Sequence, residues 1–334
     1  MFNRALQYYT RNLVIWVVLG GVAAYCWPEA FQYIGKGMKW FFALTMFGIG
    51  VVLKPQDFRV FGRKPWLVVV GCCAQYTIMP LGAFLLGKAF RLPPEYAVGL
   101  ILTGAAPGAM TSNVMSYLAK ADAAYSVSLT TASTLLCPIM TPGVTYLLAG
   151  AAMDVPFTGM FVDLMLTVVV PLLAGFGLRY VARARIEAVI DVFPAISATF
   201  IVFICSVVIA INRDSLPSIT AAIGDVNGEG VIEAAVVFPI IVLTLLCADV
   251  LLNLYGMAAG YGVGALFRMA VARRRTLAIE IGMQNAGLGV VIAKEHFDKK
   301  ATLPAVFFVF LCIITASLLT TYWRRRDAAP DGAA

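Results

Sequence analysis

The sequence predicts an all-α integral membrane protein with ten transmembrane helices arranged as two inverted halves of five. Hydrophobic residues make up 61% of the 334 residues and charged residues only 13%, whereas soluble domains carry about 25% charged residues. Apolar runs recur from end to end, and about 20 apolar residues suffice to cross the hydrocarbon core of a bilayer. The basic residues gather in the short segments between these runs.

Each apolar run is expected to be a helix, because a segment inside hydrocarbon must satisfy its backbone amides internally. The ten expected spans cover residues 12–30, 36–53, 65–87, 95–118, 122–150, 156–181, 192–211, 231–265, 274–294 and 301–323. The first run follows Arg4 and Arg11, as in a signal peptide, but no clear small-residue cleavage site comes before Cys26. The first span is therefore expected to be uncleaved. Residues 213–230 are expected to form an exposed external connection.

Basic residues predict the orientation, because cytoplasmic loops carry an excess of Lys and Arg. If the N-terminus lies inside, 17 of the 25 Lys and Arg residues fall in cytoplasmic segments. Both termini are then cytoplasmic, residues 1–323 form one transmembrane domain, and residues 324–334 form a cytoplasmic tail. The net charge of +7 is therefore interpreted as contact between basic loops and membrane lipid. No nucleic-acid partner is expected. The compact length and the lack of organelle signals favour a bacterial inner membrane.

The two halves, about residues 12–150 and 156–323, must enter the membrane from opposite sides because each has an odd number of spans. Transporters built in this way place their site at the midplane, between interrupted helices. The fourth span of each half is rich in small and amide residues, at 103–113 and at 280–289. Pro107 and Gly108 are expected to break span 4, since proline removes a helical hydrogen bond. Span 9 has no proline, so Gly282, Gly287 and Gly289 are expected to loosen it.

Glu280 is the most informative single residue, because an ionisable group inside a span costs at least about 2.5 kcal/mol on insertion scales. Its span offers no basic partner, so a bound cation is expected; the alternative is a protonated acid hydrogen-bonded within the bundle. Hard cations prefer oxygen ligands. Candidate oxygens cluster in and beside the interrupted spans, at Gln75, Ser112, Asn113, Ser126, Thr130, Gln284 and Asn285. Each alone also fits a structural role, such as bonding a carbonyl of its own helix or joining two helices.

Two further acids lie in expected spans. Asp249 sits within an apolar run with Asn253 one turn later, and lipid exposure would be costly, so it is expected to face the bundle interior. Asp163 lies near the end of its span, within reach of the interface. His296 is the single histidine, which excludes a metal site built from several histidines.

Three segments carry a family resemblance: residues 46–58, 106–115 and 280–288. They resemble the bile acid–sodium symporter family, and the resemblance extends over nearly the whole chain. It implies ten helices in a five-plus-five inverted repeat, with broken helices 4 and 9 crossing, and two sodium ions. By this resemblance, the first ion takes Ser112, Asn113, Ser126, Thr130 and Glu280. The second takes Gln75, Glu280, Gln284 and the backbone carbonyls of Ile281 and Met283.

The chain differs from the bile-acid-binding bacterial members that it resembles. Those members carry a threonine where this chain has Met110, and a His-Asn pair where it has Cys312 and Ile313. The predicted function is therefore sodium-coupled symport of a small organic anion: a pantoate-like or keto-acid carboxylate, or a bile-acid-like compound. Thr111 and Asn285, with Met110, are expected to contact the anion, because the N-termini of half-helices carry positive partial charge.

Three other function classes are alternatives to this prediction. A proton-coupled transporter would use Glu280 or Asp249, and a membrane sensor would bind a ligand without transporting it. An intramembrane enzyme is not expected, because the sequence has no Gly-x-Gly-Asp or His-Glu-x-x-His motif and no nucleophile with a histidine partner. No cofactor is expected apart from sodium as the coupling ion.

Overall fold

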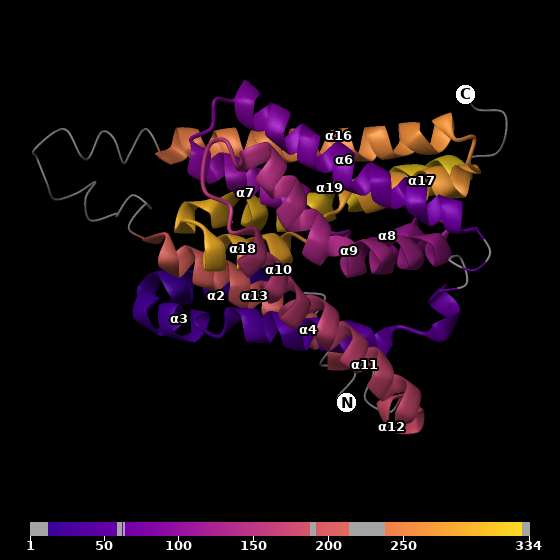
Figure 1. The fold of residues 1–334 in the computed structure, drawn as a ribbon, viewed down its shortest axis with the longest axis horizontal. Helices are drawn as coiled ribbons and strands as arrows, with labels where there is room; N and C mark the ends of the chain where they lie inside the picture. The colour runs from indigo at the N-terminus through magenta and orange to yellow at the C-terminus, as the bar shows by residue number, and fades with distance from the viewer. Residues whose placement is uncertain (1–12, 59–61, 63, 188–191, 214–237, 329–334) are drawn as a thin grey trace, which may run out of the picture.

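The computed structural model describes residues 13–58, 62, 64–187, 192–213 and 238–328. The regular structure of these residues is helical, and the helices run roughly along the long axis of the molecule (Figure 1). The expected external connection lies outside the described residues from position 214 onward, as does the start of the eighth expected span at 231–237.

The helices form two layers. The large layer contains α6 (Pro65–Ala89), α7 (Pro94–Gly104), α8 (Thr111–Leu118), α9 (Ala123–Ala149), α16 (Phe238–Leu266), α17 (Val271–Gly282), α18 (Ala286–His296) and α19 (Thr302–Ala328). The small layer contains α2 (Leu13–Cys26), α3 (Pro28–Gly35), α4 (Met38–Val52), α10 (Phe157–Leu164), the π-helical turn η2 (Met165–Val169), α11 (Val170–Val181) and α13 (Val192–Ile211). Short helical turns, η1 (Pro55–Phe58), α12 (Arg183–Glu187) and η5 (Lys299–Ala301), lie at the ends of longer helices.

Among the described residues, five helices are long and apolar enough to cross a membrane: Pro65–Ala89, Ala123–Ala149, Phe157–Val181, Pro239–Leu266 and Lys299–Asp327. Three shorter apolar helices correspond to the first, second and seventh expected spans. The first expected span is shorter than predicted, because α2 ends at Cys26 and a separate helix, α3, starts at Pro28. Proline at the first helical position suits such a restart.

The fourth and ninth expected spans are each interrupted. Residues 105–110 separate α7 from α8, and residues 283–285 separate α17 from α18. The two unwound segments lie antiparallel: the amide of Ala109 donates to the carbonyl of Met283 at 3.0 Å, and the amide of Asn285 donates to the carbonyl of Pro107 at 2.8 Å. Each break thus satisfies backbone groups that the other leaves open.

The expected cause of the second break was partly wrong. Gly282 is the last residue of α17, but Gly287 and Gly289 lie inside α18. The new helix starts instead at Asn285, whose side chain accepts a hydrogen bond from the amide of Leu288 at 3.3 Å. Asparagine is among the preferred residues for capping a helix N-terminus.

Glycines bring α16 directly onto α17. Gly256, Gly260 and Gly264 recur at every fourth position of α16, so they share one face of the helix. A Cβ atom added at Gly260 would lie 2.5 Å from the carbonyl oxygen of Leu277 on α17. Small residues at this spacing let membrane helices approach closely, and α16 thereby supports the segment that leads into the second break.

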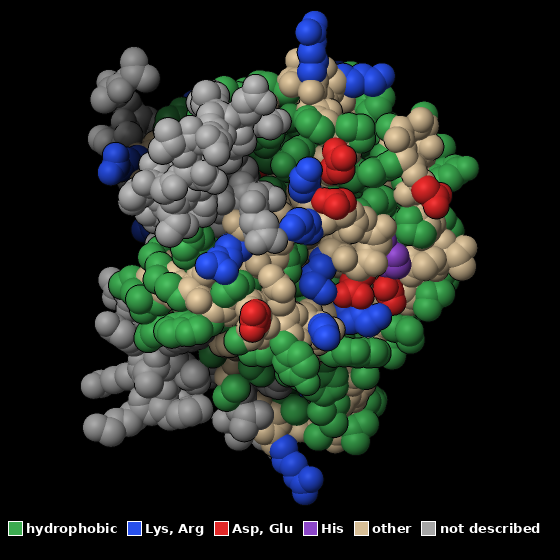
Figure 2. Space-filling model, turned by 90° about the vertical axis from the view of Figure 1, so that its left-hand side faces the viewer, with side chains coloured by type: hydrophobic (Ala, Val, Ile, Leu, Met, Phe, Trp, Pro, Cys, Tyr) green, Lys and Arg blue, Asp and Glu red, His purple; other side chains and the backbone are tan. Residues whose placement is uncertain are grey.

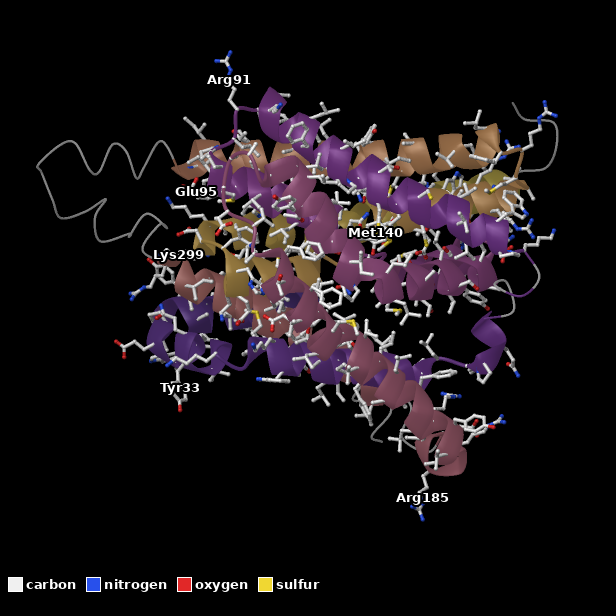
Figure 3. The ribbon with its side chains drawn as sticks, in the orientation of Figure 1. Tyr33, Arg91, Glu95, Met140, Arg185 and Lys299 are labelled. Carbon is white, nitrogen blue, oxygen red and sulfur yellow. The ribbon has the colours of Figure 1, made fainter. Side chains whose placement is uncertain are left out.

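Polar ends and apolar sides fit a protein that crosses a membrane along its long axis. Arg91, Glu95 and Lys299 lie at one end of the molecule, and Arg185 lies at the other (Figure 3). Large apolar side chains are exposed between the ends, including Ile139 in the middle of α9 at 59%. Exposed apolar surface of this extent is unusual for a soluble monomer.

The C-terminal helix is longer than the tenth expected span. α19 continues to Ala328, so part of the predicted tail is helical. Arg275 of α17 holds this extension by donating to both carboxylate oxygens of Asp327, at 2.6 and 2.7 Å, and its guanidinium lies over the ring of Trp323.

Candidate ion and substrate site

Glu280 lies in the last turn of α17 and is 1% exposed. Its carboxylate accepts hydrogen bonds from three hydroxyl groups on other elements: Ser112 of α8, and Ser126 and Thr130 of α9. The bond from Thr130 is 2.7 Å long. These residues are 168, 154 and 150 positions from Glu280, so the crossing of the two broken helices is what brings them together.

The hydroxyl groups around Glu280 have more acceptors than hydrogens. Each has a second oxygen within hydrogen-bond distance: Ala109 O lies 2.5 Å from Ser112, Asn113 Oδ1 lies 2.9 Å from Ser126, and the carbonyl of Ser126 lies 3.0 Å from Thr130. A hydroxyl group has one hydrogen and two acceptor lone pairs. Six side-chain oxygens, including both of Glu280 and that of Asn113, therefore share three hydroxyl hydrogens. This oxygen-rich, hydrogen-poor cluster suits a hard cation.

A second group of predicted residues lies beside the unwound segments. The side-chain amide of Gln75 on α6 donates to Gln284 Oε1 at 2.5 Å and to the carbonyl of Ala106 at 3.2 Å. Gln284 in turn donates to the carbonyl of Ile281 at 2.8 Å. The carbonyl of Met283 instead accepts the amide of Ala109. The structure thus places Gln75, Gln284 and Ile281 in one group, with Met283 joined to the crossing.

Two residues at the site were not predicted as functional. Gly108 leaves room for the carboxylate, because a Cβ added there would lie 2.8 Å from Glu280 Oε2. Ser133 accepts the amide of Gly108 at 3.3 Å. Ser133 follows Ser126 by seven residues and Thr130 by three, so extending their helical stripe along α9 would have found it.

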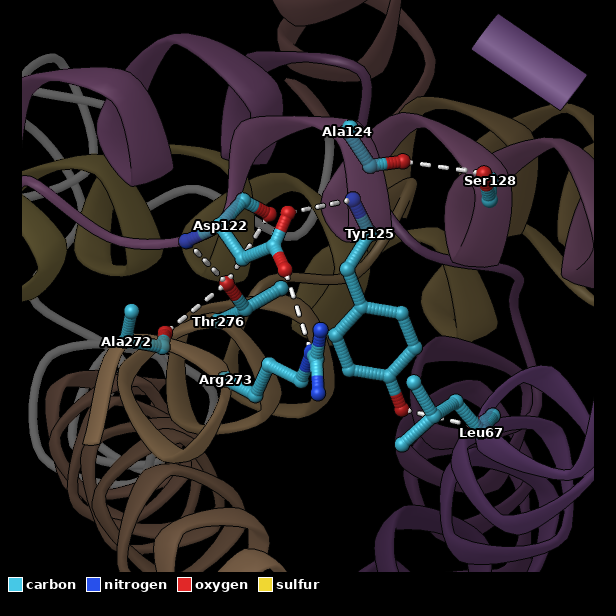
Figure 4. Close-up of polar contacts among 8 residues, drawn as sticks. All are labelled: Leu67, Asp122, Ala124, Tyr125, Ser128, Ala272, Arg273 and Thr276. Carbon is cyan, nitrogen blue, oxygen red and sulfur yellow. Dashed lines mark hydrogen bonds and ion pairs between the residues drawn. The ribbon is translucent and has the colours of Figure 1, made fainter. Parts of the chain in front are cut away.

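The start of α9 is fixed to the start of α17 by polar contacts (Figure 4). Asp122 caps α9 by accepting the amide of Tyr125 at 3.1 Å, and its other carboxylate oxygen pairs with Arg273 at 3.1 Å. Thr276 donates to the carbonyl of Asp122 at 3.1 Å. These contacts fix the helix that carries Ser126 and Thr130 against the helix that carries Glu280.

A cavity of about 140 Å³ lies next to the crossing, on the side that faces the small layer. All three residues predicted to contact the anion line it: Met110, Thr111 and Asn285. α8 begins at Thr111 and α18 begins just after Asn285, so two helix N-termini, each with positive partial charge, meet at this cavity. The described residues that line it include no charged side chain.

The opposite wall of the cavity was not predicted. It comes from α4 and α13 of the small layer, with Phe42, Thr45, Phe200 and Ile204 among its residues. These side chains belong to apolar runs that look alike in sequence, and nothing local marks them. Cys312 and Ile313, where the chain differs from the bile-acid binders, also line the cavity.

A search against family models matches residues 40–219 of the chain to the sodium bile acid symporter family. The matched region includes the first interrupted span and α9. The second interrupted span, with Glu280, lies outside it.

Curated relatives extend over most of the chain. It is 35% identical over 312 residues to the uncharacterized sodium-dependent transporter YocS of Bacillus subtilis, covering 93% of this chain and 90% of the relative. It is 33% identical to the probable chloroplastic sodium/metabolite cotransporter BASS1 of Arabidopsis thaliana, over 93% of this chain and 73% of the relative. It is 30% identical to the human hepatic sodium/bile acid cotransporter, over 80% of this chain and 72% of the relative.

Proposed function

The chain belongs to the sodium bile acid symporter family, and from this premise we propose that it couples sodium entry to the uptake of a small carboxylate across a bacterial inner membrane. The relatives are sodium-dependent transporters and cotransporters, so the chain is a transporter and not an enzyme. Sodium is the coupling ion.

The proposed membrane arrangement is ten spans in two inverted halves within a single domain, residues 1–323. Five long helices, three shorter apolar helices and two interrupted spans support it. The interruptions fall in the fourth and ninth spans, which are the corresponding positions of an inverted repeat. Both termini are placed in the cytoplasm because 17 of the 25 Lys and Arg residues then lie on that side.

The observation that carries the sodium proposal is the buried cluster in which six oxygens share three hydroxyl hydrogens. A sodium ion there would take Glu280 and the oxygens of Ser112, Asn113, Ser126 and Thr130. A second ion would take Gln75, Gln284 and the carbonyls of Ile281 and Met283, with Glu280 shared. Gln284 Oε1 accepts the amide of Gln75 here, and its second lone pair would be available to the ion.

The cavity supports a small cargo. Its volume of about 140 Å³ is below the roughly 300–1,000 Å³ of pockets that hold drug-sized ligands. Two helix N-termini would face a carboxylate, while Phe42 and Phe200 offer an apolar wall. A short branched carboxylate of the pantoate or keto-acid type has this combination of a charged head and a compact apolar body, and taurocholate exceeds the cavity as it stands.

Uptake by purified protein in liposomes tests the proposal, with a panel of small carboxylates and taurocholate under a sodium gradient, a proton gradient or no gradient. We expect concentrative uptake of a small branched carboxylate with sodium alone. An interior-negative potential should speed it, because two sodium ions with one monovalent anion move one charge, about 2.3 kcal/mol per 100 mV. Proton-driven uptake without sodium would favour the proton-coupled alternative, and binding without flux would favour a sensor.

A further inference from the structure

Asp249 is a buried acid that the sodium proposal does not use. It lies in the middle of α16 and is 0% exposed, and neither of its carboxylate oxygens has a hydrogen-bond partner in the described part of the chain. Asn253, one turn further along α16, is equally buried, and its side-chain oxygen is also without a partner. The amide nitrogen of Asn253 donates to the carbonyl of Gly282, the last residue of α17, at 2.7 Å.

The described helices around Asp249 provide no counter-charge. α17, α19 and α6 pack against α16, and among the described residues no basic side chain forms an ion pair with Asp249. The basic residues of these helices are used or lie at their ends: Arg275 of α17 binds Asp327, and Lys88 of α6 lies over the ring of Phe84. Glu280 of α17 is held by its three hydroxyl donors.

Cys312 is a titratable residue of α19, which packs against α16. Its thiol bonds the carbonyl of Val309 of its own helix. An ionised carboxylate in such a place would be both unpaired and desolvated, which is among the most costly arrangements in a protein interior.

We propose that Asp249 and Asn253 form a proton-binding site that is separate from the sodium cluster. With a proton bound, the Asp249 hydroxyl donates to the free side-chain oxygen of Asn253; the two residues are four apart on one helix, where side chains are neighbours. One proton then removes the charge and gives a donor to the free oxygen of Asn253. A metal cation fits less well, because hard cations take six or more oxygens and this pair offers three.

The proton also acts on the second break. Protonated Asp249 fixes the amide of Asn253, and that amide holds the carbonyl of Gly282 immediately before the unwound residues 283–285. Loss of the proton would remove the hydrogen bond from Asp249 to the side chain of Asn253, which would then be held only by its bond to Gly282. The position of the break, and with it Gln284, therefore depends on the proton at Asp249. This last step rests on the proposed sodium site, whereas the proton site itself does not.

Infrared spectroscopy of the full-length protein in lipid at neutral pH and saturating sodium tests the proton site directly. We expect the spectrum of the wild type minus that of Asp249→Asn to show the carbonyl band of a protonated carboxyl group. The matched control is Asp154→Asn, an exposed acid between α9 and α10, whose difference spectrum should show an ionised carboxylate. A carboxylate band for Asp249 would overturn the proposal. Asn at 249 keeps the size and a hydrogen-bond donor, so the variant should fold.

Sodium affinity tests the link to the break. Asp249→Asn should bind sodium like the wild type, while Asp249→Leu and Asn253→Leu should each bind it about fivefold more weakly, the equivalent of one ordinary hydrogen bond. The double Leu variant should be no weaker than either single variant, because both act through one chain of bonds. Additive effects, or wild-type affinity in the Leu variants, would overturn the link. A wild type that does not respond to sodium would refute the sodium proposal, and the infrared result would still decide the proton site.

Discussion

At the scale of single residues, Glu280 is the most important side chain for the proposed sodium binding, because it is the one group that both proposed ions share. Its three hydroxyl donors stabilise a negative charge, and their remaining lone pairs stay available to a cation. A proton and sodium therefore compete for the same carboxylate. Acidification should weaken sodium binding, since a protonated Glu280 offers no charge to the ion.

We predict that Glu280→Gln folds and inserts normally but loses sodium-driven uptake. The substitution keeps the size and hydrogen bonding of the side chain, but leaves each ion with neutral oxygens only, in a medium where charge interactions are strong. Substrate affinity should fall as well, because the coupling between ion and substrate is reciprocal. The measurement is sodium-dependent thermal stabilisation together with uptake in the same preparation.

Neutral ligands provide the comparison for Glu280. Ser112→Ala and Gln75→Ala should each reduce sodium stabilisation less than Glu280→Gln, because each removes one uncharged oxygen from one site. If Glu280→Gln keeps wild-type sodium stabilisation and flux, Glu280 is a structural acid and the sodium assignment is incorrect.

Gly108 gives a steric test of the same site. A methyl group at Gly108 would lie 2.8 Å from Glu280 Oε2, so Gly108→Ala should displace the carboxylate and weaken sodium binding by about tenfold, equivalent to about 1.4 kcal/mol. The matched control is Gly262→Ala on α16, where an added Cβ has no neighbour within 4 Å. Sodium titrations of thermal stability measure both, and equal affinities in the two variants would contradict the prediction.

The sequence predicted these polar residues but not their surroundings. Glu280 stands out because an acid in an apolar run requires an explanation, and Ser126 and Thr130 stand out because they share a helix face. Phe42 and Phe200 have no such signal: their position at the cavity depends on how the small layer packs against the large layer. No pattern within one span carries that information.

At the scale of helices, the first break was predictable and the second was only partly so. Pro107 lacks the amide hydrogen that a helix interior needs, and the small residues around it let the helix open there, whereas Pro80 and Pro138 lie inside continuous helices. The second break is placed by its partner, since residues 107–109 supply the bonds for 283–285. Gly289, expected to loosen the helix, instead allows α18 to pack closely, with an added Cβ only 3.3 Å from Ala305 of α19.

The contact of α16 with α17 should depend on the size of residue 260. Gly260→Val would drive a side chain into the backbone of α17, where even a Cβ lies 2.5 Å from the Leu277 oxygen. We expect a loss of about 1–3 kcal/mol in stability, the usual cost of overpacking, seen as a lower melting temperature in detergent. Gly262→Ala again serves as control. An unchanged melting temperature for Gly260→Val would show that α16 and α17 can separate without cost.

At the scale of the whole molecule, the cavity lies where the two layers meet, so a movement of one layer against the other would open it to one side of the membrane. Charged side chains bridge the layers at one end. Lys39 of α4 lies 3.6 Å from Asp163 of α10 and 3.9 Å from Glu295 of α18, and His296 lies 3.0 Å from Asp163. This group of mixed charges is visible on the end face of the molecule (Figure 2).

Cross-linking across this bridge tests whether the layers move. Lys39→Cys and Glu295→Cys, in a background without the exposed Cys26, Cys73 and Cys247, would place one thiol on each layer. We expect a short reducible cross-linker to abolish sodium-driven uptake and a reductant to restore it, because rocking of one bundle against another is how such transporters alternate access.

A cross-link inside one helix is the matched control for this experiment. Arg183→Cys with Glu187→Cys joins residues four apart on α12, which already form an ion pair at 3.0 Å, and it leaves both layers free to move. Uptake should therefore survive that cross-link. If the fully cross-linked Lys39 and Glu295 pair transports at the wild-type rate, the layers stay fixed at this end during transport, and access to the cavity must change by movement within the large layer instead.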